Sequence, residues 1–352
     1  MPVDGKNQDT GKAGAKCHDV YQDIRSGIEK GRFTGVLPGV RELAQKFDVN
    51  FMTVDRAIKK LEVDGFVYRV PRKGTYAKRQ YNVAICFNDP NPDAMSAPVY
   101  YRVVMGAQRY FSENNCPMFL EGTLLHQHNV VNILRKKIDG FLFFYNHRYG
   151  MPEELLRLPC VRIMGDVGEL PLFDHVGYNN SVIGKLAAEY VLSNGCRSGA
   201  FVGPTFPESF NFTERYMTFA ATLEAAGCRC YNFSTNIKQD YYDTEAQIKK
   251  LLAMNPLPES IFCPSDSLML SICIILYRHG IRPNKDIQVV ACNNMGQIIL
   301  DVPDLFASVD IRSEDIGALA AEQLLKRIKN PKSPVEEKLL EPRLVIPDDI
   351  RK

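Results

Sequence analysis

The chain has 352 residues, more than one compact core usually contains, so we expect two or three domains. Hydrophobic residues make up 45% and charged residues 24%, which argues against disorder along most of the chain. The net charge of +2 is uneven, because residues 1–80 hold 16 Lys and Arg against 10 Asp and Glu, a balance of +6, and the rest is at −4. Positive charge is therefore concentrated in the segment where a polyanion can bind.

The amino-terminal segment divides into an arm and a helix. Residues 1–16 carry almost no apolar side chains, so we expect a mobile arm without a packed structure. From residue 17 onward apolar side chains recur at helical spacing, namely at Val20, Tyr21, Ile24 and Ile28. Gly31 follows, which predicts that this amphipathic helix ends there.

The segment GVRELAQKFDVNFMTVDRAIKKLEVDGF predicts two further helices joined by a short turn at residues 48–50. The inward positions are Leu43, Ala44 and Phe47 in the first helix and Val54, Ala57, Ile58 and Leu61 in the second. Asn50 can cap the second helix, and Gly65 can end it in a left-handed conformation. This spacing is typical of a helix-turn-helix.

Two short strands, 66–70 and 75–77, follow and enclose a basic turn at residues 71–74. A helix-turn-helix followed by a basic hairpin is a winged helix. The order of "RELAQKFDV", "TVDRAIKKLEVDGFV" and "RKGTY" resembles the DNA-binding domain of the GntR family over roughly residues 18–78. We place the winged helix-turn-helix domain at residues 17–78.

The resemblance implies that the third helix enters the major groove of double-stranded operator DNA and that the wing touches the minor groove or the backbone. The DNA-binding residues expected on this basis are Arg41, Asn50, Phe51, Thr53, Arg56, Arg72, Lys73 and Thr75. For each, a surface salt bridge or a helix cap is the alternative.

Two positions depart from the family, which often carries basic residues where this chain has Phe51 and Asp55. Phe51 can pack on a thymine methyl group. Asp55 can accept a hydrogen bond from cytosine or orient Arg56. The residues usual in the family therefore do not predict the operator sequence of this protein.

After a linker at residues 79–82, strands and helices alternate, which predicts parallel sheets. The predicted strands are 83–87, 118–121, 141–145, 161–165, 200–203, 260–263 and 287–291. The predicted helices are 100–114, 182–193, 213–226, 268–279 and 313–329. The expected fold class is α/β, with a winged helix-turn-helix and two doubly wound lobes that face a cleft over residues 83–347.

Four segments carry a second resemblance: "HVGYNNSVIGKLAAEYVLSNGCRSGAFVG", "ERYMTFAATLEAAG", "PSDSLMLSICIILYRHGIRPNKDIQVVACNN" and "SVDIRSEDIGALAAEQLL". They resemble the effector domain of LacI-type repressors, which is similar to periplasmic sugar-binding proteins. A GntR-type head on a LacI-type body also resembles the AraR-like regulators. The combination implies a transcription repressor that senses a small molecule.

Polar residues at strand ends bind ligand hydroxyls in the resembled domains, and an aromatic ring can stack on a sugar. The ligand-binding residues expected here are Asp89 (or Asn88), Tyr100, Asp166, Arg215, Asp266 and Asn293. Asp266 can instead cap a helix, and Asp166 and Asn180 can hold loops as Asx turns. Asn293 and Ile311 replace more polar family residues, so a sugar, a nucleobase or nucleoside, and a degenerate pocket without ligand all stay open.

Other chemistry finds no support in the sequence. The ten cysteines are scattered without a CxxC pair, so we expect reduced, mostly buried thiols. His126 and His128 should point apart on a helix, and we expect no metal site. No nucleophile motif, phosphate loop or cofactor-binding motif stands at a strand-to-helix turn, so we expect neither an enzyme nor a cofactor.

No apolar run is long enough to span a membrane, and the amino terminus lacks a secretory signal, so we expect a cytoplasmic protein. We expect a homodimer, because paired winged helices can read a palindromic operator. Ligand bound in the cleft would change the spacing of the two heads. Whether ligand releases or promotes DNA binding, and whether the protein represses or activates, stays open.

Overall fold

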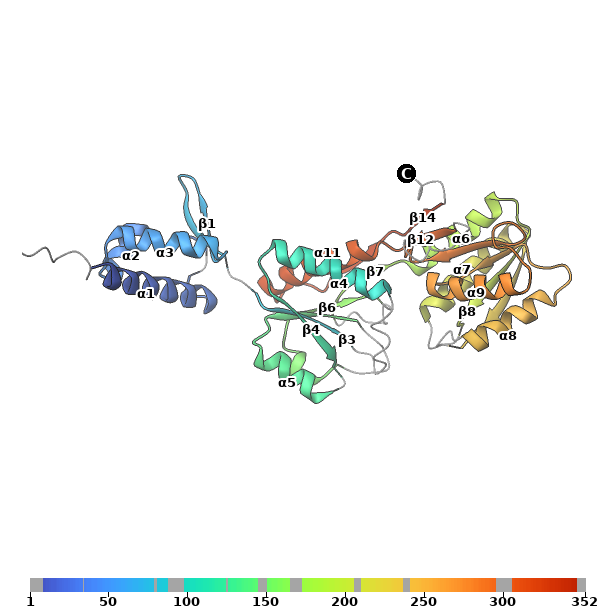
Figure 1. Cartoon of the computed structure of the whole chain (residues 1–352), viewed down its shortest axis with the longest axis horizontal. Helices are drawn as coiled ribbons and strands as arrows, with labels where there is room; N and C mark the ends of the chain where they lie inside the picture. Colours follow the sequence, from blue (N-terminus) through green and yellow to red (C-terminus); the bar gives the residue numbers. More distant parts are fainter. Residues whose placement is uncertain are drawn as a thin grey trace, which may run out of the picture. The chain divides into compact units, whose positions relative to one another are not determined.

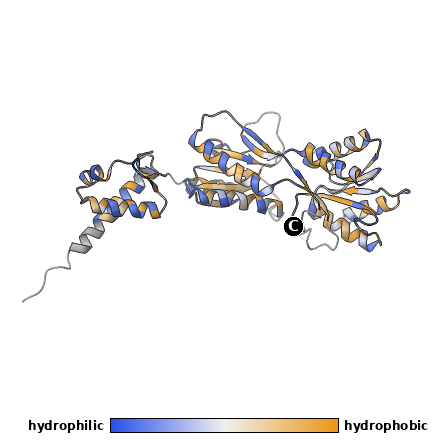
Figure 2. Ribbon diagram, turned by 90° about the horizontal axis from the view of Figure 1, so that it is seen from above, coloured by the Kyte–Doolittle hydropathy of each residue, from blue (hydrophilic) through white to orange (hydrophobic). Residues whose placement is uncertain are grey.

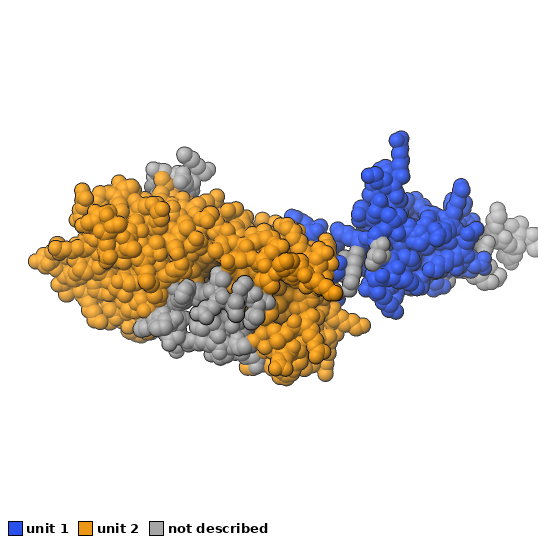
Figure 3. All heavy atoms as spheres, turned by 180° about the vertical axis from the view of Figure 1, so that it is seen from behind, with its two compact units in different colours: residues 1–82, 112–117 blue, residues 83–111, 118–352 orange. Residues whose placement is uncertain are grey.

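The structure is a computed structural model that describes residues 9–33, 35–78, 81–87, 98–124, 126–144, 151–164, 173–205, 210–236, 241–295 and 306–346. It divides into two compact units, shown in Figure 3. The first comprises residues 1–82 with 112–117, and the second comprises residues 83–111 with 118–352. The α/β class with an amino-terminal winged helix, predicted from the sequence, is confirmed.

The first unit is a three-helix winged fold with a two-stranded antiparallel wing. Its elements are α1 (Asp9–Glu29), α2 (Val40–Lys46), α3 (Phe51–Val63), β1 (Val67–Val70) and β2 (Gly74–Ala77). The apolar positions predicted from helical spacing form its core, which is made of Val20, Tyr21, Ile24, Ile28, Leu37, Leu43, Val54, Ala57, Ile58, Leu61, Phe66 and Val67.

Helix α1 begins at Asp9, which corrects the predicted start at Cys17. The part of the predicted arm over residues 9–16 is therefore helical, and residues 1–8 lie outside the described residues. The sequence D-T-G-K-A-G-A-K starts with two good capping residues and continues with alanine and lysine, which favour helix. A helix already packed from Val20 onward can extend through such residues without an apolar face of their own.

In the second unit, six described strands form a first sheet in the order β13-β7-β6-β5-β3-β4, with every neighbouring pair parallel. The strands are β3 (Val83–Phe87), β4 (Met118–Thr123), β5 (Gly140–Phe144), β6 (Cys160–Ile163), β7 (Asp174–Tyr178) and β13 (Glu337–Leu340). The helices are α4 (Pro98–Glu113), α5 (Gln127–Arg135) and α11 (Ser313–Lys329), with a 3₁₀ turn, η2, at Glu153–Leu155. Figure 1 shows α4 and α11 on one face of this sheet and α5 on the other.

Six further described strands form a second sheet in the order β14-β12-β11-β10-β8-β9, in which only the β12–β14 pair is antiparallel. The strands are β8 (Ser198–Gly203), β9 (Arg229–Ser234), β10 (Ser260–Phe262), β11 (Gln288–Cys292), β12 (Ala307–Asp310) and β14 (Arg343–Val345). The helices are α6 (Asn180–Ser193), α7 (Phe210–Ala225), α8 (Tyr241–Leu252) and α9 (Asp266–Arg278).

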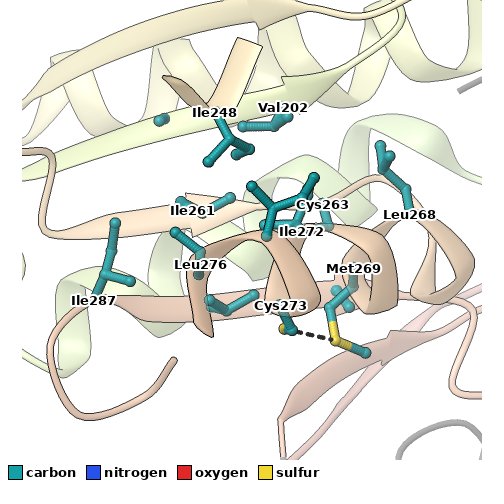
Figure 4. Close-up of a cluster of buried hydrophobic side chains, with 14 of the residues drawn as sticks. Val202, Ile248, Ile261, Cys263, Leu268, Met269, Ile272, Cys273, Leu276 and Ile287 are labelled. Carbon is teal, nitrogen blue, oxygen red and sulfur yellow. Dashed lines mark hydrogen bonds between the residues drawn. The ribbon is translucent and has the colours of Figure 1, made fainter. Parts of the chain in front are cut away.

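Successive side chains along these buried strands point to opposite faces of the sheet, and each face packs into its own core. One set packs with α8 and α9 in the cluster of Figure 4, where Val202, Ile261 and Cys263 meet Ile248 and residues of α9. The other set faces α7, where the Phe262 ring lies 5.0 Å from that of Phe219. In Figure 2 the helices show hydrophilic and hydrophobic residues in alternation along their length, as expected for helices that cover a sheet on one side.

The chain passes between the two sheets at the ends of β7, β12 and β13, so neither lobe is continuous in sequence. The return helix α11 is tied to the first sheet by a buried ion pair, in which Arg327 Nη2 donates to Asp174 Oδ1 at 2.6 Å. It also crosses α4 closely, because a Cβ on Gly106 would lie 2.0 Å from the Glu314 carbonyl oxygen. These contacts fix α4, whose first turn matters for the site.

Several elements escaped prediction, namely α5, α8, β7, β9, β12, β13 and β14. The predicted strand ends at Tyr145 and Gly165 lie outside the described residues. No helix in the described part of the chain combines the length and the apolar character needed to cross a bilayer.

Candidate DNA-contact surface and ligand cavity

The helix-turn-helix closes with the caps that the sequence predicts. Asn50 Oδ1 accepts a hydrogen bond from the backbone N–H of Met52 at 2.9 Å, which starts α3. Gly65 has a φ of +76°, the left-handed conformation expected after the end of the helix. Asn50 is thus a helix cap in this structure, with its side-chain oxygen occupied.

The predicted DNA-contact cations are all exposed. Arg41 lies on α2, Arg56 on α3, and Arg72 and Lys73 lie at the wing turn. Within the part of the chain that the structure describes, none of the four forms an ion pair. Exposed cations that are not engaged in ion pairs are available to phosphate oxygens and base edges.

The wing turn presents its two cations through a strained hairpin. The backbone N–H of Lys73 donates to the Val70 carbonyl at 3.0 Å, Arg72 has a φ of +63°, and Gly74 has a φ of +117°. Thr53 on α3 and Thr75 on β2 are half-buried, so only part of each side chain can reach a partner.

Asp55 does not orient Arg56, which corrects one of the alternatives for this residue. Its carboxylate pairs with Arg69 at 3.0 Å and with Lys59 at 3.1 Å. These two cations lower the pKa of Asp55, Lys59 most strongly, so the carboxylate stays ionised and paired. The negative charge on α3 is thereby neutralised within the protein.

A cavity of about 160 Å³ opens in the second unit where strands of both sheets end. It is lined by Val99, Tyr100, Phe144, Ile163, Met164, Tyr178, Asn211, Phe212, Arg215 and Asn293. Phe144, Ile163 and Tyr178 are the last residues of β5, β6 and β7, and Asn293 directly follows β11. The predicted location, beyond the carboxyl ends of parallel strands, is therefore where the cavity lies.

Arg215 is the central polar group of this cavity, and it is 1% exposed. Its Nε donates to Asn180 Oδ1 at 2.9 Å, and its Nη1 donates to the Pro264 carbonyl at 2.6 Å. The guanidinium carbon lies 5.4 Å from the ring centroids of both Tyr178 and Phe212. Neutral acceptors and two aromatic rings hold the cation, and no described carboxylate pairs with it.

Two residues that line the cavity have left-handed backbones. Met164 has a φ of +56° and Asn293 a φ of +98°. The carbonyl of Met164 lies 3.2 Å from Nε2 of the buried His175, and the N–H of Asn293 donates to Val309. Such conformations persist where neighbouring structure enforces them, and they concentrate at binding sites.

Asp266 does not belong to the described cavity lining. It is fully buried at the start of α9, where Ser265 and not Asp266 is the cap. Its Oδ2 accepts from the Met295 N–H at 2.6 Å, and its Oδ1 accepts from Ser308 Oγ at 2.9 Å. Burial raises the pKa of Asp266 to about 7 against these hydrogen bonds. The residue supports the loop that carries Asn293.

The structure therefore brings together three of the predicted ligand residues, Tyr100, Arg215 and Asn293. Asn88, Asp89 and Asp166 lie outside the described residues. Ile311 is fully buried and is not among the described lining.

Sequence reasoning missed the other lining residues. Phe144 lies near the carboxyl end of the strand predicted over residues 141–145, which was an available signal, whereas Tyr178 ends β7, a strand that the sequence did not predict. Asn211 and Phe212 lie in the first turn of α7, one turn before Arg215, so their position on the same helix was a second signal.

Other predicted features can also be compared with the structure. His126 and His128 are stacked, with ring centroids 5.5 Å apart, which corrects the expectation that they point apart; His126 is the cap residue before α5 and not part of the helix. Within the described ranges, no group of three or more potential ligands could hold a metal ion. All ten cysteines are free thiols and eight are buried, as predicted.

A winged helix-turn-helix joined to two doubly wound lobes around a polar cavity defines a DNA-binding transcription regulator with a ligand-binding domain. Residues 16–77 match the family of bacterial regulatory proteins called gntR, and residues 188–347 match the periplasmic binding protein-like domain. The chain thus combines a gntR-type head with a periplasmic binding protein-like domain, which is the domain combination predicted from the sequence.

Similar proteins agree with this class. The ribose operon repressor of Haemophilus influenzae is 24% identical over 269 residues, which cover 73% of this chain and 79% of that protein. The transcriptional repressor PurR of Aliivibrio salmonicida is 25% identical over 251 residues, covering 66% and 72%. A LacI family regulator from Enterococcus faecium, solved with bound ribose, shares the fold with a TM-score of 0.63, 20% identity, and coverage of 75% and 96%.

Proposed function

We propose that this protein is a cytoplasmic, non-enzymatic transcription repressor that binds operator DNA through its winged helix and releases it when a sugar occupies the cavity. The cavity beyond the strand ends, with Arg215 at its centre, is the observation that carries the proposal. A guanidinium fork, two asparagine amides and aromatic faces are the groups that recognise hydroxyls and the C–H face of a sugar.

The four aromatic rings of the lining favour a second candidate effector, a nucleoside. A flat base can stack on Tyr100 or Phe144, whose rings already meet at 4.9 Å in an edge-to-face arrangement. If the effector is a sugar, sugars should change DNA binding, and if it is a nucleoside, nucleosides should. One panel that contains both classes of ligand therefore separates the two candidates.

The test measures operator release. DNA duplexes that bind the full-length protein are first selected from a random pool. One selected duplex is then labelled, and its fluorescence anisotropy with the protein bound is followed while pentoses, hexoses, cellobiose, sugar phosphates and nucleosides are added. A sugar that weakens DNA binding supports the proposal, and by linkage the same factor must appear in the affinity for the sugar when DNA is bound. Release by nucleosides alone supports the second candidate. Stronger DNA binding with a sugar reverses the proposed sign.

We propose that the protein acts as a homodimer, and α9 supplies the argument. One face of this helix is buried in the cluster of Figure 4, yet its opposite face is also apolar, with Leu270, Ile274 and Tyr277 exposed by about two fifths. A helix that is apolar all round belongs in an interior, so a second copy is the partner we place against this face.

Sedimentation velocity tests the dimer. Ile274→Asp should convert a dimer into a monomer and weaken binding to a palindromic operator, because the two heads are no longer linked. Lys185→Asp, at an exposed position of α6, is the matched control. A wild-type chain that sediments as a monomer at micromolar concentration would contradict the dimer.

A further inference from the structure

Helix α3 exposes two neighbouring apolar side chains at its start. Phe51 is 59% exposed and Met52 is 53% exposed, whereas the apolar residues that follow them, up to but not including the last residue of the helix, are 0 to 1% exposed: Val54, Ala57, Ile58 and Leu61. A single exposed apolar residue needs no explanation. An adjacent pair in the first turn of a recognition helix is different, since that turn meets base edges in helix-turn-helix complexes.

The charged residues of α3 next to Phe51 and Met52 are compatible with binding to DNA. Arg56 lies one turn after Met52, at the i,i+4 position on the same side of the helix, and it is exposed. Asp55, one turn after Phe51, is occupied by Lys59 and Arg69. The helix therefore offers a free cation for a phosphate or a base, and its carboxylate is neutralised where DNA would otherwise repel it.

The side-chain oxygen of Asn50 is not available to read a base at this end of α3. Its side-chain oxygen is held by the Met52 N–H, so it is the cap that positions the two apolar side chains. In the first turn Phe51 and Met52 are the exposed side chains, whereas Thr53 is half-buried and Val54 is buried. The thymine 5-methyl group is the apolar feature that a base pair presents in the major groove.

We propose that Phe51 and Met52 read thymine 5-methyl groups, so that each operator half-site carries thymines under the first turn of α3. The proposal rests on the proposed DNA-binding function and adds the base that this turn selects. Packing an aromatic ring or a thioether on a methyl group removes apolar surface from water on both sides.

The test removes single methyl groups from the DNA. Operator duplexes selected by the full chain are remade with deoxyuridine in place of one thymine at a time, and dissociation constants are measured at fixed salt. Deoxyuridine keeps all hydrogen-bonding groups of thymine. At the contacted positions we expect binding to the wild-type chain to weaken about fourfold, the factor that burial of one methyl-sized group contributes.

Protein variants combined with the same DNA changes form a double-mutant cycle. Phe51→Ala and Met52→Ala should each bind thymine and deoxyuridine equally at the position that the residue contacts, since the partner of the methyl group is gone. Val63→Ala is the matched control, because Val63 is an apolar residue, 86% exposed, at the far end of the same helix. It should keep the full thymine preference.

Three results would overturn the proposal. Deoxyuridine that is tolerated at every position shows that no methyl group is read. A thymine preference that survives in both alanine variants assigns the reading to other residues. Loss of self-association in Phe51→Ala, with an unchanged thymine preference, shows that the apolar pair packs against a second copy. If the protein enriches no duplex at all, the result contradicts the proposed DNA binding itself and is thereby distinguished from the three results above.

Discussion

The winged helix and the two-lobed unit hold their candidate binding residues differently. Arg41, Arg56 and Lys73 are exposed and form no ion pair among the described residues, whereas Arg215 is almost completely buried and bonded to Asn180 and Pro264. A surface that meets a long polyanion can leave its cations in water until DNA arrives. A cavity that meets a small molecule must orient its polar groups in advance, because each contact counts for more.

Mutations in the two units should therefore have different effects. Polar residues of the two-lobed unit should contribute to stability as well as to binding, since removing one leaves a buried partner unsatisfied. Exposed residues of the winged helix should contribute to binding alone.

The buried ion pair of α11 should show the largest effect. Asp174 accepts hydrogen bonds from Arg327, Gln323 and the Glu336 N–H. Asp174→Asn leaves Arg327 as a buried cation without its carboxylate, and we expect the free energy of unfolding of the two-lobed unit to fall by about 3 to 5 kcal/mol. Urea denaturation followed by far-ultraviolet circular dichroism measures this change.

The control for Asp174→Asn is Glu322→Gln on the same helix. Glu322 pairs with Lys326 at the surface, so its loss should cost at most about 0.5 kcal/mol. Equal effects of the two variants would contradict the ranking of buried over exposed charges.

Asp266 should make stability depend on pH. Burial raises its pKa from 3.8 to about 7 in the folded chain, so the folded state holds a proton that the unfolded state has already lost between these values. The contribution is complete below about pH 4 and is lost as pH rises toward 7, by about 1.4 kcal/mol per pH unit. We expect Asp266→Asn to flatten the fall in stability between pH 5 and pH 7.

Thermal unfolding at several pH values in that range measures the slope for both chains. Asp286→Asn is the control, because Arg282 lowers the pKa of this surface carboxyl to about 2 and keeps it ionised throughout. An Asp266→Asn variant that keeps the wild-type slope would show that this carboxyl is already ionised at pH 5.

Arg215 connects stability with effector binding. Arg215→Met keeps an unbranched apolar side chain but leaves Asn180 Oδ1 and the Pro264 carbonyl without their donor, so we expect a loss of about 1 to 3 kcal/mol in unfolding free energy. The effector response should disappear while operator binding stays. Arg282→Met, at an exposed ion pair, is the control and should change neither.

Local patterns predicted the winged helix because its features are local. The cap at Asn50, the left-handed Gly65 and the apolar faces of α1 and α3 all follow from spacings of a few residues. In the two-lobed unit the missed strands carry no such signal. Strand β7 is fully buried yet contains Asp174 and His175, because Arg327 and Glu337 reach them from the end of the chain.

The candidate cavity shows the same limit. Resemblance located Arg215 and Asn293, but it treated Asp266 in the same way although the carboxyl group of Asp266 turns toward Met295 and Ser308. A position in a motif indicates which strand end a residue occupies. Whether its side chain faces the cavity or the loop below depends on the backbone of the neighbouring strand, which a single sequence does not contain.

The smallest effect on stability should come from the winged-helix cations. Arg41→Ala and Lys73→Ala should change unfolding free energy by less than about 0.5 kcal/mol, because neither residue is buried or paired among the described residues. Each should nevertheless weaken operator binding by about 1 to 3 kcal/mol if it reads a base, or lower the salt dependence by about one ion if it contacts a phosphate. Fluorescence anisotropy at several salt concentrations separates the two cases.

Lys185→Ala, which removes an exposed cation of the two-lobed unit, is the control and should leave both the unfolding free energy and operator binding unchanged. Unchanged binding in Arg41→Ala and Lys73→Ala together would mean that exposure and free charge do not identify the DNA-contact residues of this winged helix.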